Sequence, residues 1–132
     1  MGRFDVGRAG AILAVADAGR SLAFYRDLLG FEVEALYDEP PYATLARAGM
    51  RLSLAEQGHR APDHDVVLRA PAARDTVPAM VVLEVADALV AHAALVAAGA
   101  EVVAPVFSPP WGGHRFFLRD PDGFLVEVEE LA

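Results

Sequence analysis

The sequence lacks cysteine and long apolar runs, and it has little positive charge. A chain without cysteine forms no disulfide, and no stretch approaches the roughly 20 apolar residues of a membrane-spanning helix. Acidic residues outnumber basic ones by 19 to 11, so the net charge is −8 and the pI is near 4.8. Such a charge disfavours a phosphate backbone and tolerates cationic small molecules. We therefore expect neither a nucleic-acid partner nor a membrane.

Several catalytic signatures are also missing. The sequence has no Cys-x-x-Cys pair, no phosphate-cradling glycine loop, no Ser-His-Asp order and no basic aromatic platform. Its first residues lack the apolar core of a secretory signal, so we expect a cytoplasmic protein. The 132 residues are 55% apolar and 23% charged, which suits one soluble domain with a sizeable core.

The chain repeats itself. The tripeptide Val-Ala-Asp at 15–17 recurs at 85–87, and a glycine that precedes a strand occurs at 30 and again at 99. In each half an apolar strand leads to an Asp that suits a helix N-cap, and the glycine suits the C-terminal end of that helix. Each half therefore predicts a strand, a helix and three more strands. The pair should form two curved sheets that face a shared cavity.

The boundaries of the repeat follow from composition. We expect a single domain over residues 1–132, with module one at about 9–55, a linker at about 56–77 and module two at about 78–131. The linker is rich in Gly, His, Pro, Asp and Arg, and residues 66–68 within it predict one short strand. In module two, residues 101–106 predict a strand as well.

The end of the chain predicts a β-hairpin. Two β-rich runs, 114–118 and 124–130, flank the turn sequence Asp-Pro-Asp-Gly at 120–123. In the second run apolar residues at 124, 126 and 128 alternate with the residues between them. Glu127 therefore leaves the sheet on the face opposite the apolar set. Without further information a solvated carboxylate is the simpler interpretation of Glu127.

These features resemble the vicinal oxygen chelate superfamily, which includes glyoxalases, bleomycin-resistance proteins and extradiol dioxygenases. The resemblance covers nearly the whole chain, and its most specific parts are residues 17–31 and the turn at 120–123 followed by Glu127. It implies an α+β fold of two tandem βαβββ modules that form a half barrel of the glyoxalase/bleomycin-resistance type, with a ligand site on the concave face. It also implies a homodimer, in which the N-terminal module of one chain faces the C-terminal module of the other.

The resemblance also implies where a metal would be held. Metal-dependent members place one ligand near the start of each module's first strand and one in each module's last strand. Those positions fall on Gly10, Ser53, Met80 and Glu127. Glu127 alone suits a divalent ion, whereas a catalytic metal normally has three protein ligands. We therefore expect no metal and no other cofactor, with one divalent metal bound by Glu127 as the alternative.

The remaining candidate residues would line a ligand cavity. Trp111 lies between prolines and glycines, which suits either a hydrophobic plug or an aromatic ligand wall. His114 is either solvated or a ligand contact, and Tyr42 and Phe107 would extend the aromatic wall. The predicted ligand-binding set is Glu127, Trp111, His114, Tyr42, Phe107, Ser53 and Met80. Arg51 or Arg115 could pair with Glu127 and neutralise it.

The function that the sequence favours is that of a non-catalytic, metal-free protein that sequesters an aromatic or cationic drug-like ligand, as antibiotic-resistance proteins of the superfamily do. A metal-dependent lyase, isomerase or extradiol-type dioxygenase with an unusual ligand set, such as Glu127 with His114, is the alternative. A ligand-free structural module, with its cavity filled by its own side chains, is a third.

Overall fold

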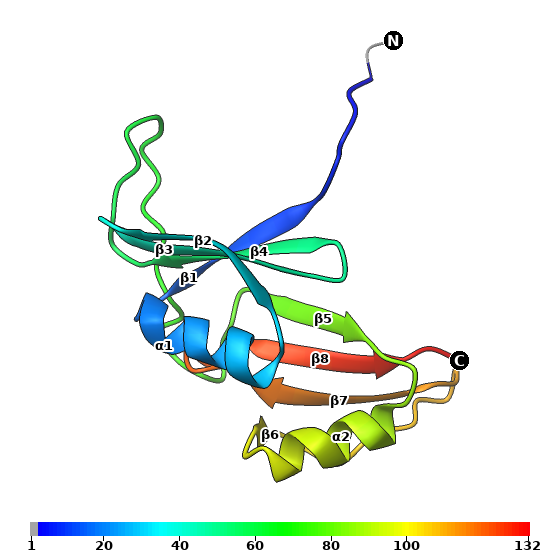
Figure 1. The fold of residues 1–132 in the computed structure, drawn as a ribbon. Helices are drawn as coiled ribbons and strands as arrows, with labels where there is room; N and C mark the ends of the chain where they lie inside the picture. Colours follow the sequence, from blue (N-terminus) through cyan, green and yellow to red (C-terminus); the bar gives the residue numbers. More distant parts are fainter. Residues whose placement is uncertain (1–2) are drawn as a thin grey trace. The chain divides into compact units, whose positions relative to one another are not determined.

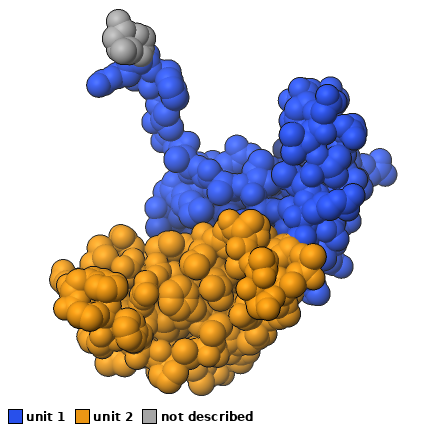
Figure 2. Space-filling view, turned by 180° about the vertical axis from the view of Figure 1, so that it is seen from behind, with its two compact units in different colours: residues 1–70 blue, residues 71–132 orange. Residues whose placement is uncertain are grey.

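The structure is a computed structural model that describes residues 3–132, so the first two residues of the expected domain lie outside the described range. The chain divides into two compact units, residues 1–70 (unit 1) and residues 71–132 (unit 2) (Figure 2). Each unit contains a four-stranded mixed sheet and one helical segment (Figure 1). Within the described residues, no helix is long and apolar enough to cross a membrane.

Unit 1 has the predicted order of a strand, a helix and three strands. Its sheet has the strand order β1-β4-β3-β2, in which β1 pairs with β4 in parallel and the other pairs are antiparallel. The helical segment is α-helical in its first part and widens into a π-helix in its second part. The elements are β1 (Gly10–Val15), α1 (Ala18–Ala23), η1 (Phe24–Leu28), β2 (Glu32–Asp38), β3 (Pro41–Arg47) and β4 (Met50–Glu56).

Unit 2 repeats this plan. Its sheet has the order β5-β8-β7-β6, again with the first strand of the unit parallel to the last. The elements are β5 (Met80–Glu84), α2 (Ala88–Ala97), β6 (Glu101–Val102), β7 (His114–Arg119) and β8 (Leu125–Glu130). The tandem βαβββ repeat and the α+β class expected from the sequence are thus confirmed.

The two helices begin in the same way. The predicted N-caps are confirmed. The Asp17 carboxylate accepts a hydrogen bond from the Arg20 amide at 2.9 Å, and the Asp87 carboxylate accepts one from the Val90 amide at 3.1 Å. Each first turn has a second acceptor from the last strand of its unit. Glu56 accepts from the Ala18 amide at 3.2 Å, and Glu130 accepts from the Ala88 amide at 2.8 Å. The carboxylates occupy the end of the helix dipole that favours negative charge.

Strand alternation divides each sheet into a face covered by the helix and a face opposite it. Apolar side chains of β3 and β4 that pack under α1 are fully buried, among them Leu45, Leu52 and Leu54. In unit 2 the corresponding residues are Phe116, Leu118, Val126 and Val128. The ring of His92 on α2 meets the ring of Phe116 edge to face at 4.9 Å, which identifies the helix side of this sheet. The face opposite the helix is not covered by the helix of its unit.

The terminal hairpin is confirmed, including the chemistry of its turn. The Asp120 carboxylate accepts from the amides of Asp122 and Phe124, both at 2.9 Å, and Gly123 has φ +94°. A Cβ at Gly123 would lie 3.0 Å from the backbone of Arg74. Glycine is therefore required here both by the backbone and by its neighbour.

Two strand predictions were wrong. The expected strand at 101–106 covers only Glu101–Val102, because Pro105 has no amide hydrogen and the pairing resumes only as an isolated bridge between Phe107 and Arg115. Residues 66–68 form no strand; Val67 makes an isolated bridge to Arg60. The first part of the expected linker instead folds onto unit 1, where Gln57 hydrogen-bonds to Val15 and to the amide of Ala70.

Candidate functional site

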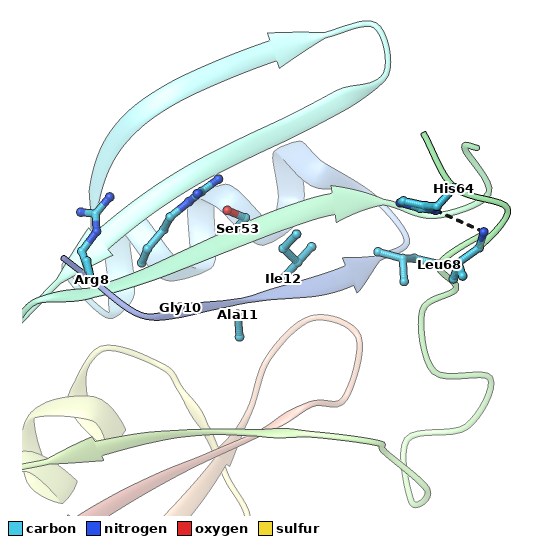
Figure 3. A pocket seen from close by; sticks show the side chains of 9 residues that line it. Arg8, Gly10, Ala11, Ile12, Ser53, His64 and Leu68 are labelled. Atoms are coloured by element: carbon cyan, nitrogen blue, oxygen red, sulfur yellow. Dashed lines mark hydrogen bonds between the residues drawn. The ribbon is translucent and has the colours of Figure 1, made fainter. Parts of the chain in front are cut away.

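The face of the unit 1 sheet opposite α1 borders a cavity of about 550 Å³ (Figure 3). Strands β1 and β4 form its floor, the segment before β1 contributes Arg8, and the loop between β4 and β5 contributes His64, Val66 and Leu68. We call this the first cavity. The residues that line it are Arg8, Gly10, Ala11, Ile12, Arg51, Ser53, His64, Val66 and Leu68. This volume lies within the range of about 300–1,000 Å³ that is common for small-molecule sites.

Ser53 lies at the centre of the floor, opposite Ile12 in the pairing of β1 with β4. Its residue is fully buried, and its hydroxyl oxygen has no hydrogen-bond partner among the described residues. Figure 3 shows Ser53 and Ile12 on the sheet floor between Arg8 and the loop that carries His64 and Leu68. A buried hydroxyl without a partner costs free energy and calls for a physical explanation.

Gly10 lies beside Arg51 in the same strand pair. A Cβ at position 10 would overlap the carbonyl oxygen of Arg51 and lie 2.8 Å from its Cβ. The absence of a side chain at Gly10 therefore allows the close approach of Arg51 at this point of the β1–β4 pair.

Arginines line one end of the first cavity. Both terminal nitrogens of Arg8 donate to the Glu34 carboxylate, at 2.7 and 2.8 Å. These hydrogen bonds raise the pKa of Arg8 and lower the pKa of Glu34 below its usual value. The charge of Arg51 also lowers the pKa of Glu34. The Arg51 backbone amide donates to Ala9, but the Arg51 side chain makes no hydrogen bond or ion pair with another described residue. Arg51 is thus a cation with its donors available.

His64 closes the other end of the first cavity. Its Nδ1 accepts a hydrogen bond from the Val66 amide at 3.2 Å (Figure 3). A neutral imidazole that accepts at Nδ1 carries its proton on Nε2, so that nitrogen is a donor. Ile12, Val66 and Leu68 give this end an apolar surface.

Glu127 projects from the face of the unit 2 sheet opposite α2, as the alternation predicted. It accepts a hydrogen bond from the Arg115 guanidinium at 3.2 Å, and its side chain is 14% exposed. The Arg115 guanidinium also lies over the rings of Phe107 and Phe117, at 5.9 and 5.3 Å from their centroids. Arg115 is therefore the arginine that neutralises Glu127, and the buried Nε of Arg115 has no hydrogen-bond partner within residues 3–132.

Two further predicted residues lie on the same face of unit 2 as this ion pair. Val82 pairs with Glu127, and Met80 lies two residues earlier on the same side of β5, where its side chain is 54% exposed. Phe107, which the sequence placed in an aromatic wall, is held beside Arg115 by two backbone hydrogen bonds, of 2.8 and 2.9 Å. Glu127, Phe107 and Met80 thus share one face of unit 2.

His114 does not lie on that face. Along β7, residue 114 shares the helix side of the sheet with Phe116, whereas Arg115 and Phe117 share the side of Glu127. The His114 ring is hydrogen-bonded to the Ser108 hydroxyl at 2.7 Å. The suggested ligand set of Glu127 with His114 is therefore wrong, because the strand directs the two side chains to opposite faces.

Trp111 and His114 line a separate cavity of about 300 Å³ in unit 2, together with Arg115, Glu129 and the C-terminal residues. Trp111 is 73% exposed in this chain, so it does not act as a buried plug within unit 2. Tyr42, the last residue of the predicted set, lies on the Ser53 face of the unit 1 sheet and contacts Tyr37 edge to face at 6.1 Å. It lies outside the lining of the first cavity.

Residues 7–128 match the model of the Glyoxalase/Bleomycin resistance protein/Dioxygenase superfamily. The chain belongs to this superfamily. No curated protein sequence matches it.

Solved structures with this fold include members with different described roles. TioX from Micromonospora sp. ML1 is 22% identical, with a TM-score of 0.74, and the match covers 95% of this chain and 98% of that one. TnmS3, an antibiotic binding protein from Streptomyces sp. CB03234, is 20% identical, with a TM-score of 0.72 and coverage of 100% and 99%. Lactoylglutathione lyase from Agrobacterium tumefaciens is 21% identical, with a TM-score of 0.74 and coverage of 92% and 91%. At these identities the likeness shows the fold.

The residues of this superfamily member do not suit the metal that its enzymatic relatives would use. In unit 1 the two expected positions carry Gly10, which has no side chain, and Ser53. In unit 2 they carry Met80 and Glu127, and the carboxylate of Glu127 already accepts from Arg115. Among residues 3–132 there is no group of three His, Cys, Asp or Glu side chains placed to hold a metal ion.

Sequence reasoning predicted Ser53 as a ligand-binding residue but missed the other polar residues that line the first cavity. Arg51 was considered only as a partner for Glu127, although it lies two residues before Ser53 and so shares its face. Arg8 precedes Gly10 by the same interval, which could have suggested its position. His64 had no such signal, because the fold of the 57–70 loop brings it to the cavity. The polar residues of the lining can donate hydrogen bonds to a ligand, and its apolar residues can pack against a ligand's apolar surface.

Proposed function

We propose that this superfamily member binds and sequesters an aromatic, drug-like small molecule without transforming it. One observation carries the proposal. Among the described residues, two buried side-chain polar atoms lack a hydrogen-bond partner, Ser53 Oγ and Arg115 Nε. Each lies on the sheet face opposite the helix of its unit, the face on which the superfamily resemblance implies ligand binding. A ligand that hydrogen-bonds to these atoms would explain why neither has a partner in the chain alone.

The aromatic character of the ligand is supported by exposed rings in unit 2. Phe107 is 52% exposed and Trp111 is 73% exposed, so both have ring surface for stacking. The antibiotic binding protein TnmS3, which has the same fold, makes antibiotics of this kind reasonable first ligands to test.

The ion pair changes the expectation of a cationic ligand at Glu127. The carboxylate already has a cation in Arg115, and a second cation would be repelled by that guanidinium. The proposal therefore keeps the aromatic, drug-like character of the ligand and assigns no role to a positive charge at Glu127. It retains the expected homodimer and the cytoplasmic location.

The single tryptophan supplies the test. Bleomycin- and mitomycin-like drugs, with neutral and anionic aromatic compounds, should be titrated while Trp111 emission and its quenching by acrylamide are recorded. We expect at least one compound to shift the emission saturably and to reduce the quenching, because stacking would shield the indole. Native mass spectrometry should then find that compound bound and chemically unchanged. If the compound is turned over, the protein is an enzyme and the proposal fails.

A further inference from the structure

We infer that the first cavity recognises the carboxylate group of an apolar organic acid. The inference rests on the proposed function and specifies the ligand's chemistry: a planar anionic group at the arginine end and an aromatic or aliphatic body at the other. Nothing in the superfamily resemblance assigns this role to Arg51, Ser53 or His64.

The donors of the cavity call for an acceptor. The Ser53 hydroxyl is fully buried and unpartnered among the described residues, and Arg51 has its guanidinium available two residues away on the same face of β4. Successive residues on one face of a strand are about 7 Å apart, so an extended arginine and a serine hydroxyl can reach the same carboxylate. His64 Nε2 adds a donor at the loop end.

The charge balance of the lining favours an anion. Arg8 and Arg51 line the cavity, and its lining contains no acidic residue among those that the structure describes. Glu34 lies outside the lining and is engaged by both terminal nitrogens of Arg8. The guanidinium of Arg51 therefore retains its charge for a ligand, and a cationic ligand would meet repulsion.

The rest of the lining selects the body of the ligand. Ala11, Ile12, Val66 and Leu68 are the apolar residues of the lining. Figure 3 shows Leu68 on the loop beside His64, at the end away from Arg8. A volume of about 550 Å³ accommodates a ring system rather than a bare ion. Because an inorganic anion would leave this surface in contact with water, the lining favours an amphipathic acid.

Three compounds of one shape test the charge preference: 2-naphthoate, 2-naphthamide and 2-naphthylmethylammonium. Isothermal titration calorimetry on the full chain should show 2-naphthoate binding about tenfold or more tightly than the other two, because hydrogen bonds to a charged group are the strong ones. If either the amide or the ammonium compound binds as tightly, the inference is overturned.

Two cavity variants and a matched control locate the site. Arg51→Met should weaken 2-naphthoate binding about tenfold or more. Arg51→Lys should lose less affinity, because lysine keeps the positive charge although it lacks the planar guanidinium. Ser53→Ala should weaken binding several-fold while leaving the protein at least as stable, since it removes an unpartnered buried hydroxyl. Arg26→Met, which removes an exposed arginine paired with Asp27 on the helix, should bind like the wild type. Wild-type affinity in both Arg51→Met and Ser53→Ala would reject the site.

The same experiments distinguish a failure of the carboxylate preference from a failure of small-molecule binding. Binding of the ammonium or amide compound without 2-naphthoate would leave small-molecule binding intact and reject the carboxylate preference. Absence of binding by all three compounds would also reject the inference, whereas the Trp111 titration decides the proposed function by itself.

Discussion

At the scale of single residues, Gly10 and Ser53 distinguish this chain from a metal-dependent relative. A metal ligand cannot be restored at position 10 by substitution alone, because any Cβ would overlap the Arg51 carbonyl oxygen. At position 53 a hydroxyl replaces the expected ligand and remains unpartnered within the described residues. Both residues suit a cavity that binds organic groups.

The Glu127–Arg115 pair leads to a prediction about stability. Glu127→Gln should lower the free energy of unfolding by about 1 kcal/mol, because the partly buried Arg115 loses its carboxylate. Urea unfolding measures the change. Glu84→Gln, an exposed carboxylate on β5 of the same sheet, is the matched control and should change stability by less than about 0.5 kcal/mol. Equal unfolding midpoints for the two variants would show that the ion pair is energetically neutral.

At the scale of elements, the repeat is expressed in how each helix starts. The local N-cap, Asp17 or Asp87, was readable from sequence, but the second acceptor comes from a strand about 40 residues away: Glu56 for α1 and Glu130 for α2. This contact ties the last strand of each unit to its helix. It also holds β4 and β8, which carry Ser53 and Glu127, against the helices.

The strand-to-helix contact can be tested in unit 2. Glu130→Ala should reduce the free energy of unfolding by about 1–2 kcal/mol, since the Ala88 amide loses a charged acceptor at a helix N-terminus. Hydrogen exchange of the Ala88 amide should become faster. Glu129→Ala, at the adjacent position on the other face of β8, should leave that amide's exchange unchanged. Unaltered Ala88 exchange in Glu130→Ala would contradict the capping role.

At the scale of the whole molecule, the donor set predicts the metal content. Gly10, Ser53 and Met80 supply no strong ligand for a hard or borderline ion, and Glu127 is ion-paired. We therefore expect less than stoichiometric Zn, Ni, Fe and Mn in protein dialysed after purification, as measured by elemental analysis. One tightly held transition metal per chain would revive the lyase or dioxygenase alternative.

The exposed apolar residues predict self-association. The edge strands β2 and β5 carry Leu36, Tyr37, Met80 and Val82, all about half exposed or more, and unpaired sheet edges with apolar side chains favour association. Sedimentation velocity should give about twice the chain mass of 14.0 kDa. A species of one chain mass at micromolar concentration would reject the homodimer.

The sequence by itself determined the order of elements, the repeat and the terminal hairpin. These features depend on neighbours within a few residues: the aspartates that cap the helices, the glycines that end them, and the Asp120–Gly123 turn. The alternation in β8 also placed Glu127 on the correct face, because the buried apolar residues Val126 and Val128 share one phase while Glu127 and Glu129 share the other.

The tertiary structure decided the chemistry of the site. In β7, phenylalanines occupy both phases, so the pattern left the face of His114 open until the pairing of Phe117 with Glu127 fixed it. Likewise, the pairing of Arg115 with Glu127 depends on the register of the β7–β8 pair. The presence of His64 in the lining of the first cavity depends on the fold of the loop after β4. Such contacts are set by strand register and loop packing, which local propensities do not encode.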